Sequence, residues 1–230
     1  MSRSASKSPA ASTVVQDFLG ETYLEARETS RVSLRALADR LDVTPPAISR
    51  MAQRLVRQGL MRREGACGLL LSESGERVAL KSIRKRRIFE AFLVAKMGYT
   101  WDQVYPIAVK TSNHLDDELV ERMFEQSGSP QCCPHGDPIP THDGHVRELR
   151  DVPLKDVREG MQARILRVAS HDSNMLRYLG SLNLKPGAPI QLVSRAPFGG
   201  PLRLRVTLNS FHDEHVIGAE LAEKIYVEAA

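Results

Sequence analysis

The chain has 230 residues, of which 42% are hydrophobic and 26% charged, with a net charge of +4 and a calculated pI near 9.1. This composition predicts a globular protein of two or three domains and excludes a membrane protein, because no apolar run approaches the roughly 20 residues of a spanning helix. The first residues lack the apolar centre of a signal peptide, and three cysteines cannot form a conventional disulfide framework, so we expect a cytoplasmic location.

The chain is expected to begin with a disordered tail, residues 1–12, followed by a helix. Apolar residues between Val15 and Ala26 recur at intervals of three and four, which predicts an amphipathic helix that packs against the next elements. This helix opens the first predicted domain, residues 13–75.

Residues 31–75 give the order helix, tight turn, helix and basic hairpin. Ser33 is a suitable N-cap for the first of these helices and Thr44 for the second, where a pair of prolines fits the first turn without loss of a helical hydrogen bond. Two short strands around Gly65 to Gly68 would form a wing. The segment therefore predicts a winged helix-turn-helix.

Positive charge is concentrated in this segment. Eight arginines and only two aspartates lie between residues 31 and 63, and such a local excess is typical of a surface that contacts DNA phosphates. The two helices and the base of the wing supply the candidate DNA-binding residues, which are Arg35, Thr44, Pro46, Ser49, Arg50, Gln53, Arg57, Arg62 and Arg63.

Residues 76–140 are predicted to form a helical domain. A long helix should run from about residue 75 to residue 97, and the Arg-Lys-Arg-Arg cluster in its middle would be either a solvated face or a contact to phosphate. Thr100 can cap the next helix, which Pro106 should kink, and Asp116 can cap a further helix.

The C-terminal part changes from helical to strand periodicity. Residues 141–150 form a predicted linker within a stretch rich in Pro, Gly and His. Residues 151–230 contain short runs that predict strands, namely 162–168, 190–193 and the alternating run 202–208. These runs predict a small β-barrel of the SH3 kind. The expected fold class is mainly α with small β parts.

Two sequence strings and the order of the domains carry a resemblance to a known family. The long helix holds Arg84-Lys-Arg-Arg-Ile-Phe-Glu-Ala-Phe-Leu, and the loop after the helices holds the octet Cys133-Pro-His-Gly-Asp-Pro-Ile-Pro. Together with residues 172–187, which are similar to part of a C-terminal SH3-like (ferrous-transport-like) domain, they resemble the diphtheria toxin repressor family of iron- and manganese-dependent regulators.

The resemblance implies a homodimer that binds a palindromic, double-stranded DNA operator when divalent metal is present and releases it when metal is scarce. Carried over by position, Thr44, Pro46 and Arg50 take the places of recognition-helix contacts. Arg50 could pair with guanine or with phosphate.

The resemblance also implies a primary metal site, from which this sequence departs. Asp17 takes the first ligand position, where a hard carboxylate favours manganese over softer metals. The positions that would supply the remaining ligands hold Val109, Ser112 and Asn113, so the expected imidazole is lost.

His114 follows one place later, and two interpretations of it stay open. The kink at Pro106 could turn His114 inward as a ligand, with Asn113, Asp17 and Glu21 as possible partners. Alternatively, His114 is a surface histidine at the edge of an apolar stripe.

The implied ancillary site has lost ligands as well. Its two histidine positions hold Arg86 and Tyr105, whereas Glu90 is retained and Asp172 stands for a glutamate of the third domain. Arg86 could supply a fixed positive charge in place of a second metal and pair with Glu90 or Asp172.

Cysteine and histidine residues after the helices permit a zinc site, formed by Cys132, Cys133, His135, His142 and His145. Their spacing lacks a second pair of the C-x2-C kind. The resemblance implies that this segment is a structural loop that closes the helical domain, and we favour this interpretation. Cys67, in the wing, is expected to be a small structural residue.

Three functions are compatible with these patterns. The first is a metal-dependent transcriptional regulator of metal homeostasis, with Mn²⁺ or alternatively Fe²⁺ as cofactor and no small-molecule substrate. The second is a regulator of the same architecture that has lost or rebuilt its metal sites and is not gated by metal. The third, a metal-dependent hydrolase, lacks an H-E-x-x-H or G-x-S-x-G motif, so we expect no enzyme.

Overall fold

The computed structural model of the chain describes residues 12–28, 32–64, 68–208 and 211–229. The chain divides into two compact units, residues 1–86, 111–115 and 140–145 in the first and residues 87–110, 116–139 and 146–230 in the second. The long helix α4 (Glu73–Met97) contributes residues to both units. The three domain ranges expected from the sequence stay predictions, and the expected tail lies outside the described residues except for residue 12.

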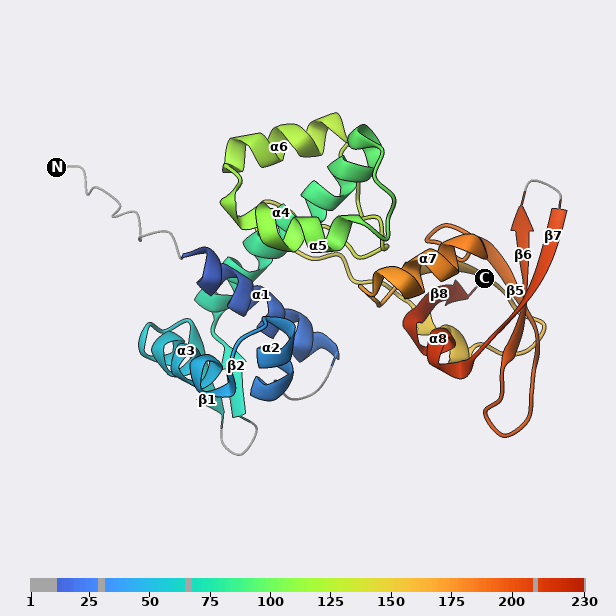
Figure 1. Cartoon of the computed structure of the whole chain (residues 1–230), viewed down its shortest axis with the longest axis horizontal. Coiled ribbons are helices and arrows are strands. Elements are labelled where there is room, and N and C mark those ends of the chain that lie inside the picture. Colours follow the sequence, from blue (N-terminus) through green and yellow to red (C-terminus); the bar gives the residue numbers. More distant parts are fainter. Residues whose placement is uncertain (1–11, 29–31, 65–67, 209–210, 230) are drawn as a thin grey trace. The chain divides into compact units, whose positions relative to one another are not determined.

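The first unit contains the winged helix-turn-helix (Figure 1), which confirms the prediction. Its core includes Phe18, Leu19, Leu37, Ile48 and Leu55, so the leading helix packs with both helices of the motif. The elements are α1 (Thr13–Glu28), α2 (Leu34–Arg40), α3 (Pro45–Arg57), β1 (Met61–Glu64) and β2 (Gly68–Leu71).

Local sequence signals set the ends of these helices. The Ser33 hydroxyl accepts a hydrogen bond from the Ala36 amide and caps α2. Thr44 occupies the N-cap position of α3 with extended backbone, but its side chain makes no capping hydrogen bond, and the two prolines stand in the first turn. Strands β1 and β2 pair antiparallel as the wing, whose tip, including Cys67, lies outside the described residues.

The helices after α4 differ from the expectation at Pro106. Helix α5 (Val104–Thr111) begins only at Val104, so Pro106 lies in its first turn, where no helical hydrogen bond is lost and no kink is required. The chain instead changes helical type after Thr111, in the 3-10 turn η2 (Ser112–His114). Helix α6 (Asp117–Gln126) follows, capped by the Asp116 carboxylate as predicted.

The basic cluster of α4 is internal, so both interpretations offered for it were wrong. Arg84 and Lys85 are buried. Arg84 donates a hydrogen bond to the Pro140 carbonyl at 2.7 Å and Arg87 donates to the Pro138 carbonyl at 2.6 Å. Buried carbonyl oxygens need donors, and the prolines of the octet limit its own amides, so α4 supplies them from its side chains.

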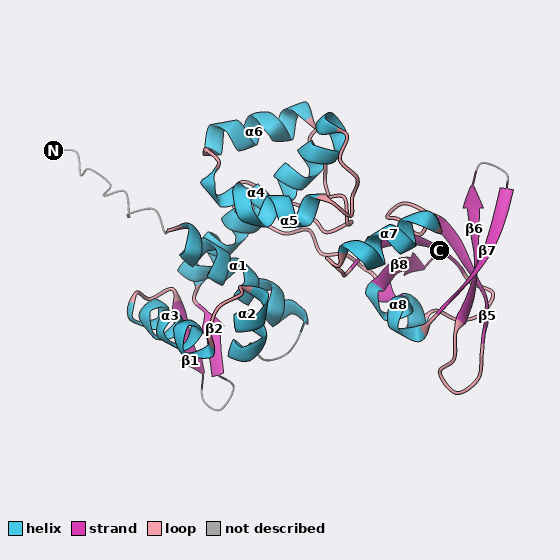
Figure 2. Cartoon of the chain, viewed as in Figure 1, coloured by secondary structure: helices cyan, strands magenta, loops and turns pink. Residues whose placement is uncertain are grey.

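The second unit contains a six-stranded antiparallel sheet in the order β3-β8-β4-β5-β6-β7, with two helices beside it (Figure 2). This is the predicted SH3-like domain. Strands β4 and β6 were predicted with their observed bounds, but helix α7 and strand β7 were not foreseen. The elements are β3 (Val152–Pro153), the 3-10 turn η3 (Leu154–Asp156), β4 (Gln162–Val168), α7 (Ser173–Ser181), β5 (Pro189–Arg195), β6 (Leu202–Leu208), β7 (Phe211–Ile217), α8 (Ala219–Lys224) and β8 (Ile225–Ala229).

The core of this unit joins the barrel to a residue of the helical segment. Trp101 belongs to the same buried cluster as Ile165, Leu176, Leu192 and Leu204.

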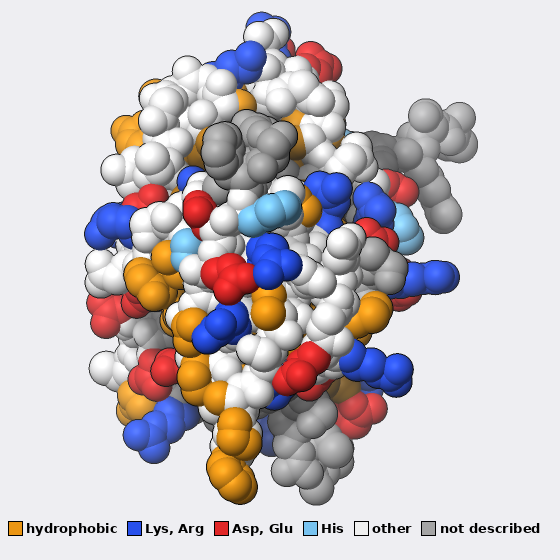
Figure 3. Space-filling view, turned by 90° about the vertical axis from the view of Figure 1, so that its right-hand side faces the viewer, with side chains coloured by type: hydrophobic (Ala, Val, Ile, Leu, Met, Phe, Trp, Pro, Cys, Tyr) orange, Lys and Arg blue, Asp and Glu red, His pale blue; other side chains and the backbone are white. Residues whose placement is uncertain are grey.

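On the face shown in Figure 3, acidic and basic side chains lie intermixed. In the described part of the chain, none of the helices combines the length and apolar character needed to cross a bilayer.

Candidate DNA interface and metal centre

Helix α3 presents a polar face to solvent. Its inner side buries Ile48, Ala52 and Leu55, and the helical period therefore turns the intervening residues outward. Ser49 is half-buried, and the other candidates on or before this helix are exposed, namely Thr44, Pro46, Arg50, Gln53 and Arg57.

The elements beside α3 extend this surface. Arg35 on α2 and Arg62 and Arg63 on β1 are exposed, and Arg62 Nη1 lies 3.1 Å from Glu64 Oε1. A shallow groove runs between α3 and the wing, lined by residues that include Ser49, Gln53 and Arg63. A helix that can enter a DNA groove, flanked by arginines that can contact phosphates, is the arrangement that DNA recognition requires.

Helix α1 carries a row of acidic residues on one face. Asp17, Glu21 and Glu25 repeat at every fourth position and therefore share a face. Glu21 and Glu25 are buried and Asp17 is half-buried. Asn113 Nδ2 donates hydrogen bonds to Asp17 Oδ1 at 2.6 Å and to Ser82 Oγ at 2.9 Å.

Two arginines neutralise the same face. Arg86 Nη1 of α4 lies 2.6 Å from Glu21 Oε1. Arg40 of α2 places Nη2 3.1 Å from Glu25 Oε2 and Nη1 3.8 Å from Glu21 Oε2. Arg86 thus has a partner on α1 that the sequence did not suggest, and its proposed pairing with Glu90 or Asp172 stays a prediction.

The predicted primary metal site does not form a convergent ligand set. Within the described ranges, Asp17, Glu21 and His114 are not part of any group of three His, Cys, Asp or Glu ligand atoms that lie within 4.8 Å of one another. His114 is exposed, whereas Asn113 is buried. Burial raises the pKa of Asp17, against the opposing hydrogen bond from Asn113 and charge of Arg86. Asp17 Oδ1 and Glu21 Oε1 therefore already accept hydrogen bonds from Asn113 and Arg86, where a metal ion would need their lone pairs.

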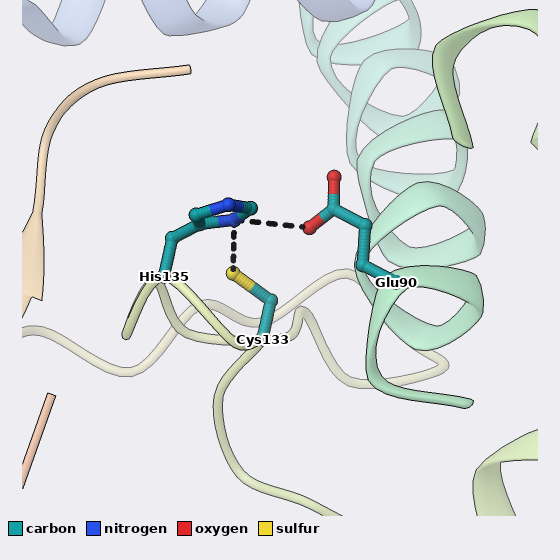
Figure 4. Close-up of side chains that lie close together, drawn as sticks. All are labelled: Glu90, Cys133 and His135. Atoms are coloured by element: carbon teal, nitrogen blue, oxygen red, sulfur yellow. Dashed lines mark hydrogen bonds and ion pairs between the residues drawn. The ribbon is translucent and has the colours of Figure 1, made fainter. Parts of the chain in front are cut away.

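A convergent ligand set lies instead in the second unit. Glu90 of α4, Cys133 and His135 are all buried, and one ligand atom of each lies within 4.8 Å of the others (Figure 4). His135 Nδ1 is 3.6 Å from Glu90 Oε2 and 3.9 Å from Cys133 Sγ. A carboxylate, a thiolate and an imidazole are ligands that divalent transition metals use.

The backbone fixes the orientation of the imidazole. His135 Nε2 lies 2.9 Å from the Trp101 carbonyl oxygen, which can only accept a hydrogen bond, so Nε2 carries the proton. Nδ1, the other ring nitrogen, therefore faces Glu90 and Cys133. A carbonyl that holds the second ring nitrogen is the usual outer support of a metal-bound histidine.

The electrostatics of this trio favour a cation. Burial raises the pKa of the Cys133 thiol. Burial also opposes protonation of His135, but Cys133 and Glu90 outweigh it and raise the pKa of His135 to about 10. Protons on His135 and Cys133 therefore balance the charge of Glu90, and a divalent ion that displaced these protons would take over that role. The residues present fit a metal ion.

The loop before α7 lies beside this cluster. The His171 ring stacks on Tyr105 with centroids 3.6 Å apart, and it meets the His135 ring edge-on at 5.6 Å. Asp172 is exposed and accepts a hydrogen bond from the Met175 amide at 2.7 Å as the N-cap of α7. Its role as a metal ligand stays a prediction.

Sequence reasoning placed Glu90 among the candidate ligands, but it did not place Cys133 and His135 beside Glu90. Glu90 was predicted as a ligand, whereas Cys133 and His135 were assigned to a structural loop because they lack a C-x2-C partner. The usable signal was the Cys-x-His spacing, which lets both side chains point to one side of a tight loop. That loop closes through an amide-to-carbonyl bond from Gly136 to Cys133, at 2.9 Å.

Comparisons with known proteins agree with this architecture. Residues 72–141 match the family described as "Iron dependent repressor, metal binding and dimerisation domain", residues 152–229 match the FeoA domain, and residues 24–65 match the MarR family. The iron-dependent repressor IdeR of Mycobacterium leprae is 31% identical over 220 residues, which span 90% of this chain and 94% of IdeR.

Two further relatives are similar over most of the chain. The diphtheria toxin repressor of Corynebacterium glutamicum is 26% identical over 184 residues, 75% of this chain and 81% of the relative. A solved manganese-dependent transcriptional repressor in complex with manganese is 31% identical and superposes with a TM-score of 0.86, covering 94% of this chain and all of the other.

The winged helix, the helical segment and the SH3-like domain define a DNA-binding transcriptional regulator with a dimerisation domain. The chain belongs to the diphtheria toxin repressor family, and it is a metal-dependent transcriptional repressor and not an enzyme.

Proposed function

We propose that this repressor binds its palindromic operator as a homodimer under control of a divalent metal held by Glu90, Cys133 and His135. The observation that carries the proposal is the convergence of these three buried side chains within 4.8 Å. Arg50 and Gln53, at the centre of the exposed face of α3, are proposed to contact bases, and Arg62 and Arg63 to contact phosphates.

The metal would join helix α4 to the octet loop. Arg87 already holds this loop through the Pro138 carbonyl, and it also lies 3.7 Å from Asp137. A metal bound by Glu90, one turn further along α4, would add bonds to Cys133 and His135 and would compensate their charge. It would therefore stiffen the C-terminal half of α4 against the loop.

The chemistry of the cluster bears on the choice of metal. The expectation of manganese rested on Asp17, whose carboxylate is engaged by Asn113. The proposed ligands instead include a soft thiolate and an imidazole, which favour Fe²⁺ over Mn²⁺. We therefore propose Fe²⁺ as the preferred metal of these two.

Operator binding measured with and without a chelator tests this proposal. The probe is the duplex that the wild-type chain enriches from a randomised DNA library in the presence of Fe²⁺. We expect chelation to weaken binding, and Fe²⁺ to restore it at a lower concentration than Mn²⁺. Equal affinity in all conditions would show that metal does not gate binding and would favour the ungated alternative.

Two cysteine variants locate the site within the same experiment. Cys133→Ser should lose bound metal, measured by mass spectrometry, and its operator affinity should no longer respond to chelation. Cys132→Ser is the matched control, because Cys132 is adjacent in sequence but outside the cluster. Loss of metal in both variants, or in neither, would refute the assignment of Cys133 as a ligand.

A further inference from the structure

Side chains of α4, η2 and α2 bond the acidic face of α1 to the rest of the first unit. We call the set Asp17, Glu21, Ser82, Arg86 and Asn113 the α1 latch. It joins α1 to α4 through Arg86 and Glu21, and to η2 through Asn113 and Asp17. Asn113 also reaches α4 through Ser82.

We propose that the α1 latch replaces the primary metal site that the family resemblance implies, with the Arg86 guanidinium as the permanent cation and the Asn113 amide as the donor. Helix α1 is then fixed to α4 at every metal concentration. The inference rests on the proposed function in one respect, which is that the chain binds an operator. No residue of the latch is a metal ligand in this proposal.

The orientation of the Asn113 amide supports a metal-free latch. A metal ligand turns its oxygen towards the ion, but the amide nitrogen faces Asp17 Oδ1 and Ser82 Oγ. The Asn113 Oδ1 atom is the one left without a hydrogen-bond partner among the described residues. Since an ionised carboxylate can only accept hydrogen bonds, the nitrogen must be the atom that faces Asp17.

Charge argues in the same direction. The Arg86 and Glu21 side chains retain only 12% and 8% of their exposure, and their atoms approach to 2.6 Å. A guanidinium keeps its charge at every accessible pH, so it repels a divalent ion that approaches the same carboxylates in a medium of low dielectric constant. The Arg86 guanidinium therefore excludes a metal ion from the latch.

The latch acts on the part of the chain that binds DNA. Phe18 and Leu19 of α1 belong to the core that also contains Leu37 and Leu55 of the helix-turn-helix. Holding the polar face of α1 against Ser82 and Arg86 thus holds the winged helix against the first half of α4. This orientation requires no ion.

Operator binding at saturating Fe²⁺ tests the latch in the full-length chain, with the same library-selected duplex. Arg86→Met should weaken binding about tenfold, within the usual range of a coupling between sites, while the metal bound per chain stays at the wild-type value. Arg86→Lys should recover most of the affinity. The control Arg77→Met removes an exposed guanidinium from the same helix and should change affinity by less than about twofold.

Substitution of Asp17 separates a latch from a ligand. Asp17→Asn keeps an oxygen that accepts from Asn113, so it should rescue the operator affinity that Asp17→Ala loses, and both variants should keep wild-type metal content. Loss of one metal ion per chain in either variant would overturn the inference, as would full operator affinity in Arg86→Met. The proposed function fails by a different result, which is metal-independent binding by the wild-type chain.

Discussion

The α1 latch and the cluster of Glu90, Cys133 and His135, here called the Glu90 cluster, compensate buried negative charge with different chemistry. Each encloses carboxylates that need positive charge. In the latch, a guanidinium and an amide supply permanent donors at 2.6 Å. In the cluster, a thiol and an imidazole surround Glu90 and can exchange their protons for a metal ion. The difference teaches that a fold with two places for a regulatory ion can keep one place exchangeable and fill the other with its own side chains.

The largest effect should come from breaking the latch at Glu21. Glu21→Ala removes the carboxylate that Arg86 contacts. It also removes one of the two carboxylates beside Arg40. Removal of one partner of a buried ion pair costs about 3 kcal/mol. We expect the free energy of unfolding, measured by urea denaturation with circular dichroism, to fall by about this amount.

A matched substitution on the surface calibrates that result. Glu73→Ala removes the partner of an exposed arginine on α4 and should lower stability by less than about 0.5 kcal/mol. Similar losses for Glu21→Ala and Glu73→Ala would mean that the latch is no stronger than a surface pair.

The second effect concerns the cluster and can be followed with one fluorophore. Trp101 is the single tryptophan of the chain, and its ring centroid lies 6.0 Å from that of His135. Binding of Fe²⁺ or Mn²⁺ should therefore change Trp101 fluorescence. His135→Asn should raise the metal dissociation constant at least about 100-fold, or about 2.7 kcal/mol.

The exposed His145 provides the control for this titration. His145→Asn should titrate like the wild-type chain, because His145 lies outside the cluster. An unchanged metal titration in His135→Asn would remove this residue from the site and with it the contrast between the two regions.

A smaller effect on operator affinity is expected from a substitution on α3, outside both the latch and the Glu90 cluster. Arg50→Ala removes an exposed guanidinium at the centre of α3 and should weaken operator binding by about 1 to 3 kcal/mol if Arg50 pairs with a base. Metal content and stability should stay unchanged. Equal weakening on operator and random duplexes in fluorescence anisotropy would instead identify a phosphate contact.

The fold was largely predictable because its signals are local. The Ser33 and Asp116 caps, the two prolines of α3 and the alternation in β6 are each contained within a few residues. Strand β7 was not predicted because Phe-His-Asp-Glu-His-Val-Ile is mostly polar, and it forms by pairing with β6 along its whole length.

The sites were less predictable because their contacts join distant positions. Arg86 has the sequence environment of a surface arginine, and its buried partner Glu21 comes from another helix. Asn113 is one of two buried residues of η2 because the chain tightens after Thr111, a change that the helical period of the sequence did not show. His135 becomes a candidate ligand only because the Trp101 carbonyl fixes its ring.

The metal content of Cys133→Ser tests the central claim most directly. The variant should be loaded with Fe²⁺, separated from free metal and measured by mass spectrometry beside the wild-type chain and the double variant with Asp17→Ala. If the cluster is the metal site and the latch is closed to metal, wild type retains one ion per chain and both variants retain none. One ion retained by Cys133→Ser and lost in the double variant would contradict the account, because Asp17 would then be a ligand.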